Sequence, residues 1–160
     1  MDTVKQYLIL HNIRSARNVG SIFRTADAAG VEKIYLTGYT PRPKDRFGRI
    51  QKEIHKTGLG AETAVPYEYK KNVINVIDQL KKKSITIVGV EQNEQSLMYY
   101  RFKVTKPTAF VFGNEVRGVS PALRKKCDAI IEIPMSGKKE SLNVSVATGI
   151  ILFHYRDAKN

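Results

Sequence analysis

The 160-residue chain has little of several residue types, and each scarcity excludes a class of protein. Cys127 is the only cysteine, which excludes an internal disulfide and a cysteine-rich zinc site and favours a reducing compartment. No run of about 18 apolar residues occurs and the first residues form no apolar leader, so we expect a soluble, cytoplasmic protein without a membrane partner. The three histidines, His11, His55 and His154, are scattered, so we expect structural or surface roles for them and no metal.

Acidic residues are also scarce, because 15 Asp and Glu stand against 27 Lys and Arg, for a formal net charge of +12. Clustered cations favour a polyanionic partner, with nucleic acid first and an anionic membrane second. The alternative that this charge only maintains solubility stays open. Many of the cations fall in the Pro- and Gly-containing segment 40–60, which is predicted to be mobile and to end in a short helix.

Apolar runs alternate with helical periodicities along the chain, which predicts an α/β fold. Its architecture is expected to be one domain over residues 1–160, with an open, mostly parallel sheet and helices on both faces. The predicted strands are 6–11, 33–37, 85–90, 109–112 and 129–133, and the predicted helices are 18–29, 72–83, one that begins at Ser120-Pro121, and one that follows Ser141.

Polar residues follow two of these strands where ligands bind in open parallel sheets. The strand 109–112 runs into Gly113-Asn114-Glu115, and the first strand is followed by Asn18, a potential helix cap, and Arg24. Each group has an ordinary alternative. Glu115 suits a tight turn, and Arg24 suits an exposed helical surface.

The C-terminal third contains a third such junction. A strand ends at Ile133-Pro134-Met135, a polar loop follows, and Ser141-Leu142-Asn143 begins a helix in which Ser141 is the expected N-cap. The first helical turn has free N–H groups that can bind a ligand. The apolar residues of the helix at helical spacing are predicted to face the core, and they are Leu142, Val146, Ala147, Gly149, Ile150 and Phe153.

Taken together, in this order and at this spacing, the three segments closely resemble the signature motifs of the SpoU, or TrmH, branch of the SPOUT RNA methyltransferases. The resemblance spans residues 7–156. It implies transfer of a methyl group from S-adenosyl-L-methionine to a ribose 2′-hydroxyl of RNA, with tRNA favoured over rRNA. It also implies a homodimer, a C-terminal trefoil knot over about residues 85–156, and a minimal form without an N-terminal RNA-binding domain.

The resemblance also implies residue roles. Arg24 would bind the substrate phosphate and orient the attacking hydroxyl, because a guanidinium does not lose its proton in ordinary protein surroundings. The immediate proton acceptor is left open. Asn18 and Asn143 would position the ribose or Arg24, and Glu115 would hold Arg24 or another basic group. Ser141 would contact the hydroxyl or the cofactor. The implied cofactor-binding residues are Val90, Glu91, Gly113, Ile133, Met135, Ser141 and Leu142. The methyl sulfonium of the cofactor would face the first motif of the partner subunit.

The cations near the first motif and in segment 40–60 are expected to bind the RNA, from both subunits, with an affinity that falls steeply with salt. These residues are Arg14, Arg17, Arg42, Lys44, Arg46, Arg49 and Lys52. The cluster Tyr99-Tyr100-Arg101-Phe102 suits either base stacking or, preferably, packing against a loop or an interface. An alternative function is an RNA-binding protein that has lost catalysis. A pure binder has no need of the full set of Asn18, Arg24, Glu115, Ser141 and Asn143.

Overall fold

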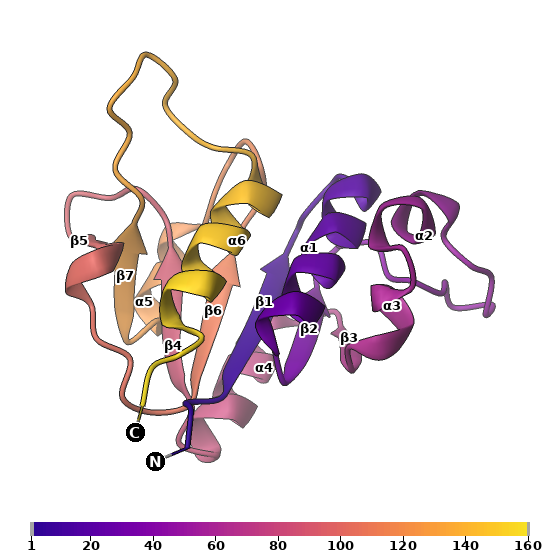
Figure 1. Cartoon of the computed structure of the whole chain (residues 1–160), viewed down its shortest axis with the longest axis horizontal. Coiled ribbons are helices and arrows are strands. Elements are labelled where there is room, and N and C mark those ends of the chain that lie inside the picture. Colours follow the sequence, from indigo (N-terminus) through magenta and orange to yellow (C-terminus); the bar gives the residue numbers. More distant parts are fainter. Residues whose placement is uncertain (1, 160) are drawn as a thin grey trace.

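The computed structural model describes residues 2–159 and contains a seven-stranded sheet in which every pairing is parallel (Figure 1). The strand order is β3-β2-β1-β6-β4-β7-β5. The strands are β1 (Gln6–His11), β2 (Lys33–Thr37), β3 (Tyr67–Lys70), β4 (Thr86–Val90), β5 (Leu97–Met98), β6 (Thr108–Phe112) and β7 (Ala129–Glu132). The helices are α1 (Ala16–Ala29), α2 (Lys52–Gly58), α3 (Ala61–Ala64), α4 (Val73–Lys82), α5 (Pro121–Lys126) and α6 (Val144–Tyr155), with a 3₁₀ turn at Tyr99–Arg101. This confirms the predicted open parallel α/β architecture.

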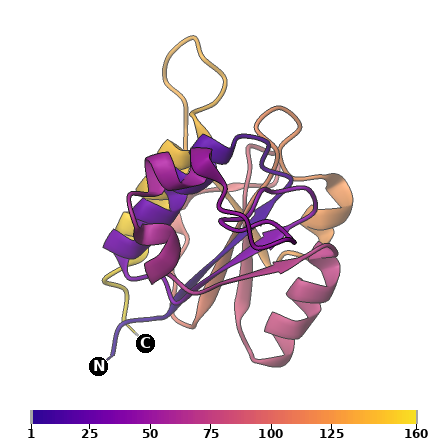
Figure 2. The ribbon, with the colours of Figure 1, turned by 90° about the vertical axis from the view of Figure 1, so that its right-hand side faces the viewer.

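Helices cover both faces of the sheet (Figure 2). Alternate residues of a strand point to opposite faces. In β1, Leu8 and Leu10 therefore join the core under α1, α3 and α6, whereas Ile9 joins the core under α4 and α5. The middle residues of β1 and β6 are apolar on both faces, as expected for a parallel sheet buried between two helical layers, and the buried polar residues Gln6 and Thr108 stand at the strand starts. The loops at the carboxyl ends of the strands, including the long connection from β7 to α6, gather at one edge of the molecule (Figure 1).

Two helix starts differ from those predicted. Helix α1 begins at Ala16, and its N-cap is Ser15, whose side chain accepts a hydrogen bond from the Asn18 N–H, so Asn18 lies inside the first turn. Helix α6 begins at Val144, and its N-cap is Asn143 rather than Ser141. The Asn143 Oδ1 accepts hydrogen bonds from the N–H and the hydroxyl of Ser145. Other caps match the sequence, because Gly30 ends α1 in a left-handed conformation and Ser120 precedes Pro121 in α5.

The predicted buried stripe of α6 is wrong. Val146 is 50% exposed, Phe153 is 43% exposed and Leu142 is 37% exposed. This helix is apolar around most of its circumference, so periodicity alone does not identify its buried face. The buried residues are Val144, Thr148, Ile151, Leu152 and Tyr155.

The aromatic cluster after β5 packs against the molecule. The Tyr155 hydroxyl donates to the Tyr99 carbonyl and lies 3.2 Å from the Phe102 carbonyl. The exposed Tyr100 ring packs edge-on against the Tyr99 ring. The packing alternative for this cluster is therefore the one that the structure supports. Within residues 2–159 no helix has the length and apolarity that a membrane crossing requires.

Candidate active site

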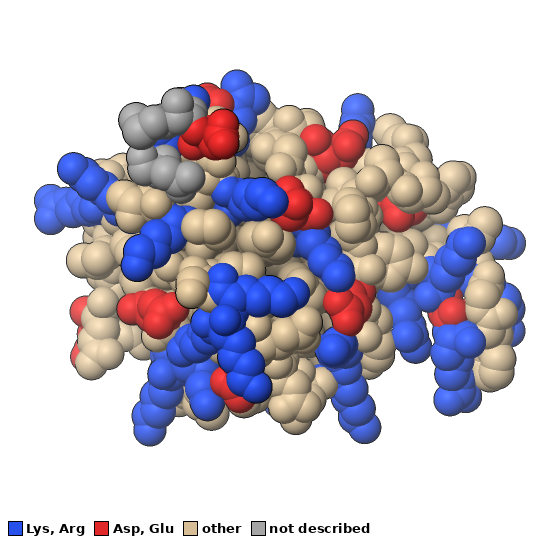
Figure 3. Space-filling view, turned by 90° about the horizontal axis from the view of Figure 1, so that it is seen from below, with Lys and Arg blue, Asp and Glu red and all other residues tan. Residues whose placement is uncertain are grey.

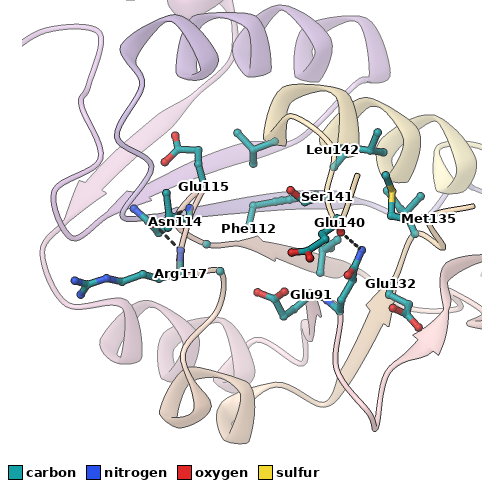
Figure 4. A pocket seen from close by; sticks show the side chains of 18 of the residues that line it. Glu91, Phe112, Asn114, Glu115, Arg117, Glu132, Met135, Glu140, Ser141 and Leu142 are labelled. Carbon is teal, nitrogen blue, oxygen red and sulfur yellow. Dashed lines mark hydrogen bonds between the residues drawn. The ribbon is translucent and has the colours of Figure 1, made fainter. Parts of the chain in front are cut away.

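The loops that follow β4, β6 and β7, together with the first turns of α6, enclose a cavity of about 460 Å³ (Figure 4). This volume lies within the usual range for small-molecule sites. All seven residues predicted to bind the cofactor line this one cavity, although their roles stay predictions. They are Val90, Glu91, Gly113, Ile133, Met135, Ser141 and Leu142.

The loop 113–118 after β6 makes one wall of the cavity and depends on two glycines. A Cβ atom on Gly113 would overlap the Gly118 carbonyl, so the two ends of the loop approach each other as closely as backbone allows. Gly118 itself has a φ of 65°, in the left-handed region that favours glycine. Between them, Asn114 Oδ1 accepts the N–H groups of Val116 and Arg117, each at 2.9 Å. The loop is thus a closed, internally bonded turn.

Glu91 and Gln92 connect the three loops of the cavity. Glu91 Oε2 accepts the Val119 N–H at 2.7 Å, and Glu91 Oε1 accepts the Gln92 N–H at 3.0 Å. The side-chain amide of Gln92 (Nε2) donates to the backbone carbonyl of Glu140 at 2.8 Å, in the loop between β7 and α6. Both Glu91 oxygens therefore bond to backbone, and the side chain fixes the shape of the cavity.

Glu115 has different partners from those predicted. Its carboxylate was expected to hold Arg24 or another basic group, but it accepts the backbone N–H groups of Arg14 and Ser15 at 3.0 to 3.2 Å. Burial by itself raises the pKa of Glu115, but these hydrogen bonds outweigh it and hold the pKa below its usual value. The carboxylate consequently fastens the cavity loop to the segment that starts α1.

The predicted catalytic residues do not all lie together. Ser141 lines the cavity. Asn143 Nδ2 donates to Asn18 Oδ1 at 3.3 Å, so the motif that contains Asn18 and the motif that contains Ser141-Leu142-Asn143 are in contact. Arg24 is not among the residues that line the cavity. It lies in a shallow hollow between α1 and α6, beside Thr25, Thr57 and Phe153. Six residues separate it from Asn18, which is about 9 Å along a helix.

Sequence reasoning missed part of the cavity wall. Four acidic side chains line the cavity in a chain with only 15 acidic residues. Glu91 and Glu115 were predicted site residues, whereas Glu132 and Glu140 were missed. A cluster of carboxylates in a strongly basic chain favours a cationic ligand, but this cluster forms only in the folded chain and gives no signal in the sequence. Asn114 was noted in the sequence, in the polar turn after strand 109–112, but was given no role. The other missed residues are Gln92, Phe112, Val116, Arg117, Gly118, Arg124, Val144 and Ala147.

The predicted RNA-binding cations lie outside the cavity, at the α2 end of the molecule. We call residues 43–51 the basic hairpin, because Lys44 and Ile50 form an antiparallel bridge within it. In the view from below, Lys and Arg side chains surround this end (Figure 3). Arg17 at the start of α1 pairs with Glu53 at 3.2 Å, and the Arg42 guanidinium lies 4.1 Å from the centre of the Tyr69 ring. The seven predicted residues are Arg14, Arg17, Arg42, Lys44, Arg46, Arg49 and Lys52, distributed over the α1 start, the hairpin and α2.

The three histidines make structural contacts. His11 Nδ1 lies 2.9 Å from the Thr37 hydroxyl, and burial lowers its pKa. His55 Nδ1 lies 2.7 Å from Glu62 Oε1, and the His154 ring packs edge-on against Tyr155. In the described part of the chain, no three His, Cys, Asp or Glu residues are grouped as metal ligands.

Known proteins resemble the chain over most of its length. The 23S rRNA (guanosine-2′-O-)-methyltransferase RlmB of Escherichia coli K12 is 38% identical over 146 residues, and the match covers 91% of this chain and 57% of the relative. RlmB of Pectobacterium atrosepticum is 36% identical, with 91% and 57% covered. The chain thus spans a little over half the length of the curated relatives it matches.

Solved structures also match. The TrmH/SpoU tRNA modifying enzyme of A. aeolicus has a TM-score of 0.82 at 32% identity, with 95% of this chain and 74% of that chain covered. The AdoMet-bound rRNA methyltransferase of Sinorhizobium meliloti has a TM-score of 0.85 at 29% identity, with 97% and 57% covered. Because the sequence model of the SpoU rRNA Methylase family matches residues 5–153, the chain belongs to that family.

Proposed function

We propose that the chain methylates a ribose 2′-hydroxyl of RNA with S-adenosyl-L-methionine as the methyl donor. The observation that carries this proposal is the cavity beyond β4, β6 and β7, because it gathers every residue that the family motifs assign to the cofactor. The family membership and the AdoMet-bound neighbour support the same assignment.

The cavity suits this cofactor chemically. Ile133, Met135 and Leu142 provide an apolar wall against which an adenine ring can lie. The carboxylates of Glu132 and Glu140 complement the positive charges of the sulfonium and the amino group. When bound, S-adenosyl-L-methionine supplies a methyl group that its sulfonium already activates.

The RNA that we favour is rRNA. The curated relatives at 36% to 38% identity carry the name 23S rRNA methyltransferase, whereas the preference for tRNA implied by the motifs has less support. The second candidate is tRNA, because the A. aeolicus tRNA modifying enzyme is 32% identical and similar in fold. Labelled S-adenosyl-L-methionine and size-fractionated RNA, followed by nucleoside mass spectrometry, would separate the two and identify the modified nucleoside.

A second copy of the chain is proposed to complete the site. Arg24 lies outside its own chain's cavity, and the apolar side chains of Val146 and Phe153 on α6 are exposed close to this region. In a homodimer Arg24 of one copy would reach the cavity of the other, bind the phosphate and orient the 2′-hydroxyl for in-line attack. Asn18 and Asn143 would hold the ribose, with Ser141 at the cavity mouth.

The trefoil knot over 85–156 is part of the same proposal. It is supported by the contact between Gln92 and Glu140, which holds the connection from β7 to α6 against the segment after β4. The fold shared with the A. aeolicus enzyme supports it further.

Complementation between two inactive variants tests the shared site. Gly113→Ala should distort the loop that forms the cavity wall and Arg24→Ala should remove the phosphate contact, so each variant alone is expected to be inactive. Co-expressed with different tags and purified as a mixed dimer, they should regain activity, because one of the two sites then has an intact cavity and an intact Arg24. A mixed dimer that stays inactive, while a mixed wild-type dimer is active, would contradict the shared site.

A further inference from the structure

Phe47 at the tip of the basic hairpin is a large apolar side chain that the proposed reaction does not use. It is 67% exposed, which leaves its ring accessible to a partner. The guanidinium carbons of Arg46 and Arg49 lie 4.8 and 5.0 Å from the centre of the ring. Ile50, on the same hairpin, is 62% exposed. The tip therefore presents an aromatic ring framed by two cations.

The hairpin fixes the backbone that carries this ring. Asp45 Oδ1 accepts the N–H groups of Phe47 at 2.8 Å and Arg49 at 3.0 Å, and Asp45 Oδ2 accepts Arg49 Nε at 2.7 Å. Gly48 makes the turn with a φ of 78° and donates its N–H to the Asp45 carbonyl. A ring on a closed turn loses little conformational freedom when it binds a ligand.

The segment before the hairpin is fastened to the cavity loop. Asn114 Nδ2 donates to the Tyr39 hydroxyl at 2.8 Å, and the Thr40 hydroxyl accepts the Ile13 N–H at 3.1 Å. The hairpin thus starts from residues bonded to the loops that surround the candidate active site. An RNA bound at the cavity mouth could extend along this side of the molecule.

Charge and aromatic character together identify the ligand. The hairpin carries Lys44, Arg46 and Arg49 against Asp45 alone, in a region crowded with cations (Figure 3). Aromatic rings that stack on bases, combined with cations that contact the backbone phosphates, are the common recognition device for single-stranded nucleic acid.

We propose that Phe47, between Arg46 and Arg49, is a stacking platform for an unpaired base of the RNA substrate. The chain would therefore favour RNA with an unpaired segment over a continuous duplex. This inference rests on the proposed function, because it takes RNA to be the substrate. A membrane surface is the alternative partner for an exposed Phe, and the experiment below distinguishes it from RNA.

The chain has no tryptophan, so Phe47→Trp places a single fluorophore on the platform. Its emission should be quenched when a single-stranded oligoribonucleotide binds, and much less by a duplex of the same length. Inorganic polyphosphate should compete for binding without quenching, because it has charge and no base. Tyr100→Trp, at another exposed aromatic position, is the matched control and should not respond.

Affinity gives an independent measurement. Phe47→Leu keeps an apolar side chain without the ring and should weaken binding of the single-stranded oligomer by about 5-fold or more, which is the effect of one stacked base. The dependence of its affinity on salt should not change, because no cation is removed. Wild-type affinity in Phe47→Leu, or quenching of Phe47→Trp by polyphosphate or by phosphatidylserine vesicles as strong as that by RNA, would overturn the platform.

The platform and the proposed function fail in different ways. Methyl transfer to RNA without quenching of Phe47→Trp overturns the platform alone. Quenching by single-stranded RNA, with no methyl transfer to any RNA fraction, supports the platform and overturns the proposed function.

Discussion

The cavity and the basic end of the molecule are built on opposite principles. Around the cavity, side chains such as Glu91 bond to backbone N–H groups of other loops, so segments distant in sequence form a closed wall. Within the basic hairpin the contacts are local, as in the bonds of Asp45 to Phe47 and Arg49, and Lys44, Arg46 and Arg49 are exposed. A small cofactor needs a preformed enclosure, whereas a large polyanion needs an open, charged surface.

One loop joins these two regions. Glu115 bonds to the N–H groups of Arg14 and Ser15, and Asn114 donates to the Asn12 carbonyl and the Tyr39 hydroxyl. The wall of the cavity is therefore also the support of the surface proposed to bind RNA. Substitutions should separate the two functions when they fall on one region, and affect both when they fall on this loop.

The largest effect confined to one of the two regions is expected for Arg24→Ala. Loss of the phosphate contact should lower the rate of methyl transfer by roughly 1,000-fold, since orientation and charge complementarity are lost together. Affinity for S-adenosyl-L-methionine, measured by calorimetry, should stay nearly unchanged, because Arg24 is proposed to bind the RNA phosphate and not the cofactor. Arg101→Ala, at an exposed arginine on the 3₁₀ turn, is the control and should keep full activity. Near-normal turnover in Arg24→Ala would refute its assignment.

A smaller effect, confined to the cavity, is expected for Gly118→Ala. The new Cβ atom would occupy a left-handed residue, at a cost of about 1 to 2 kcal/mol, and would displace the Glu91 carboxylate from the Val119 N–H. Cofactor affinity should fall roughly tenfold or more, whereas RNA affinity should not change. Gly137→Ala is the matched control, because a Cβ atom there contacts nothing within 4 Å. Equal cofactor affinities for the two variants would show that the wall is not fixed by this contact.

The sequence predicted the framework of both regions but not the contacts that join them. The continuous apolar runs of β1, β4 and β6 are recognisable because buried parallel strands lack polar alternation. The Tyr67–Lys70 edge strand and the two-residue β5 were missed, since one alternates with polar residues and the other is too short to give a pattern. Cap positions shifted by two or three residues, because several residues that can cap a helix stand before α1 and α6.

The cavity residues were predicted because the family motifs occur in the expected order along the chain. A motif does not indicate which groups its side chains bond to. Glu115 and Arg14 are 101 residues apart, and only the parallel pairing of β1 with β6 brings them together. The resemblance implied that Glu115 holds Arg24 or another basic group, whereas its carboxylate accepts backbone N–H groups. The sequence also did not indicate which face of α6 is exposed, because α6 has apolar residues around most of its own circumference.

Glu115→Gln tests the loop that joins the two regions. The substitution removes the charge that accepts the Arg14 and Ser15 N–H groups, and should lower the stability by about 1 kcal/mol, or roughly 2 to 4 °C in Tm, at neutral pH. The pKa of Glu115 in the folded protein lies below its ordinary value of 4.5, so its contribution is present above that pH and disappears as the pH falls through the folded value. The difference in Tm between the two proteins should thus vanish in acid. A difference that persists under strongly acidic conditions would mean that the carboxylate acts through shape rather than charge.

The smallest effect is expected at the basic end, for Lys44→Gln. If the exposed Lys44 contacts one phosphate, its loss should reduce the slope of log affinity against log salt by about 1, with no change in cofactor affinity. Lys125→Gln makes the same substitution on α5, on the opposite face of the sheet, and should leave the slope unchanged. Because cations at an open surface act nearly independently, the effects of Lys44 and Lys52 substitutions should add. If Lys44→Gln and Lys125→Gln change the salt dependence of RNA affinity equally, the RNA contacts the whole basic surface rather than the hairpin. The molecule would then have no end dedicated to RNA, and the contrast with the cavity would not hold.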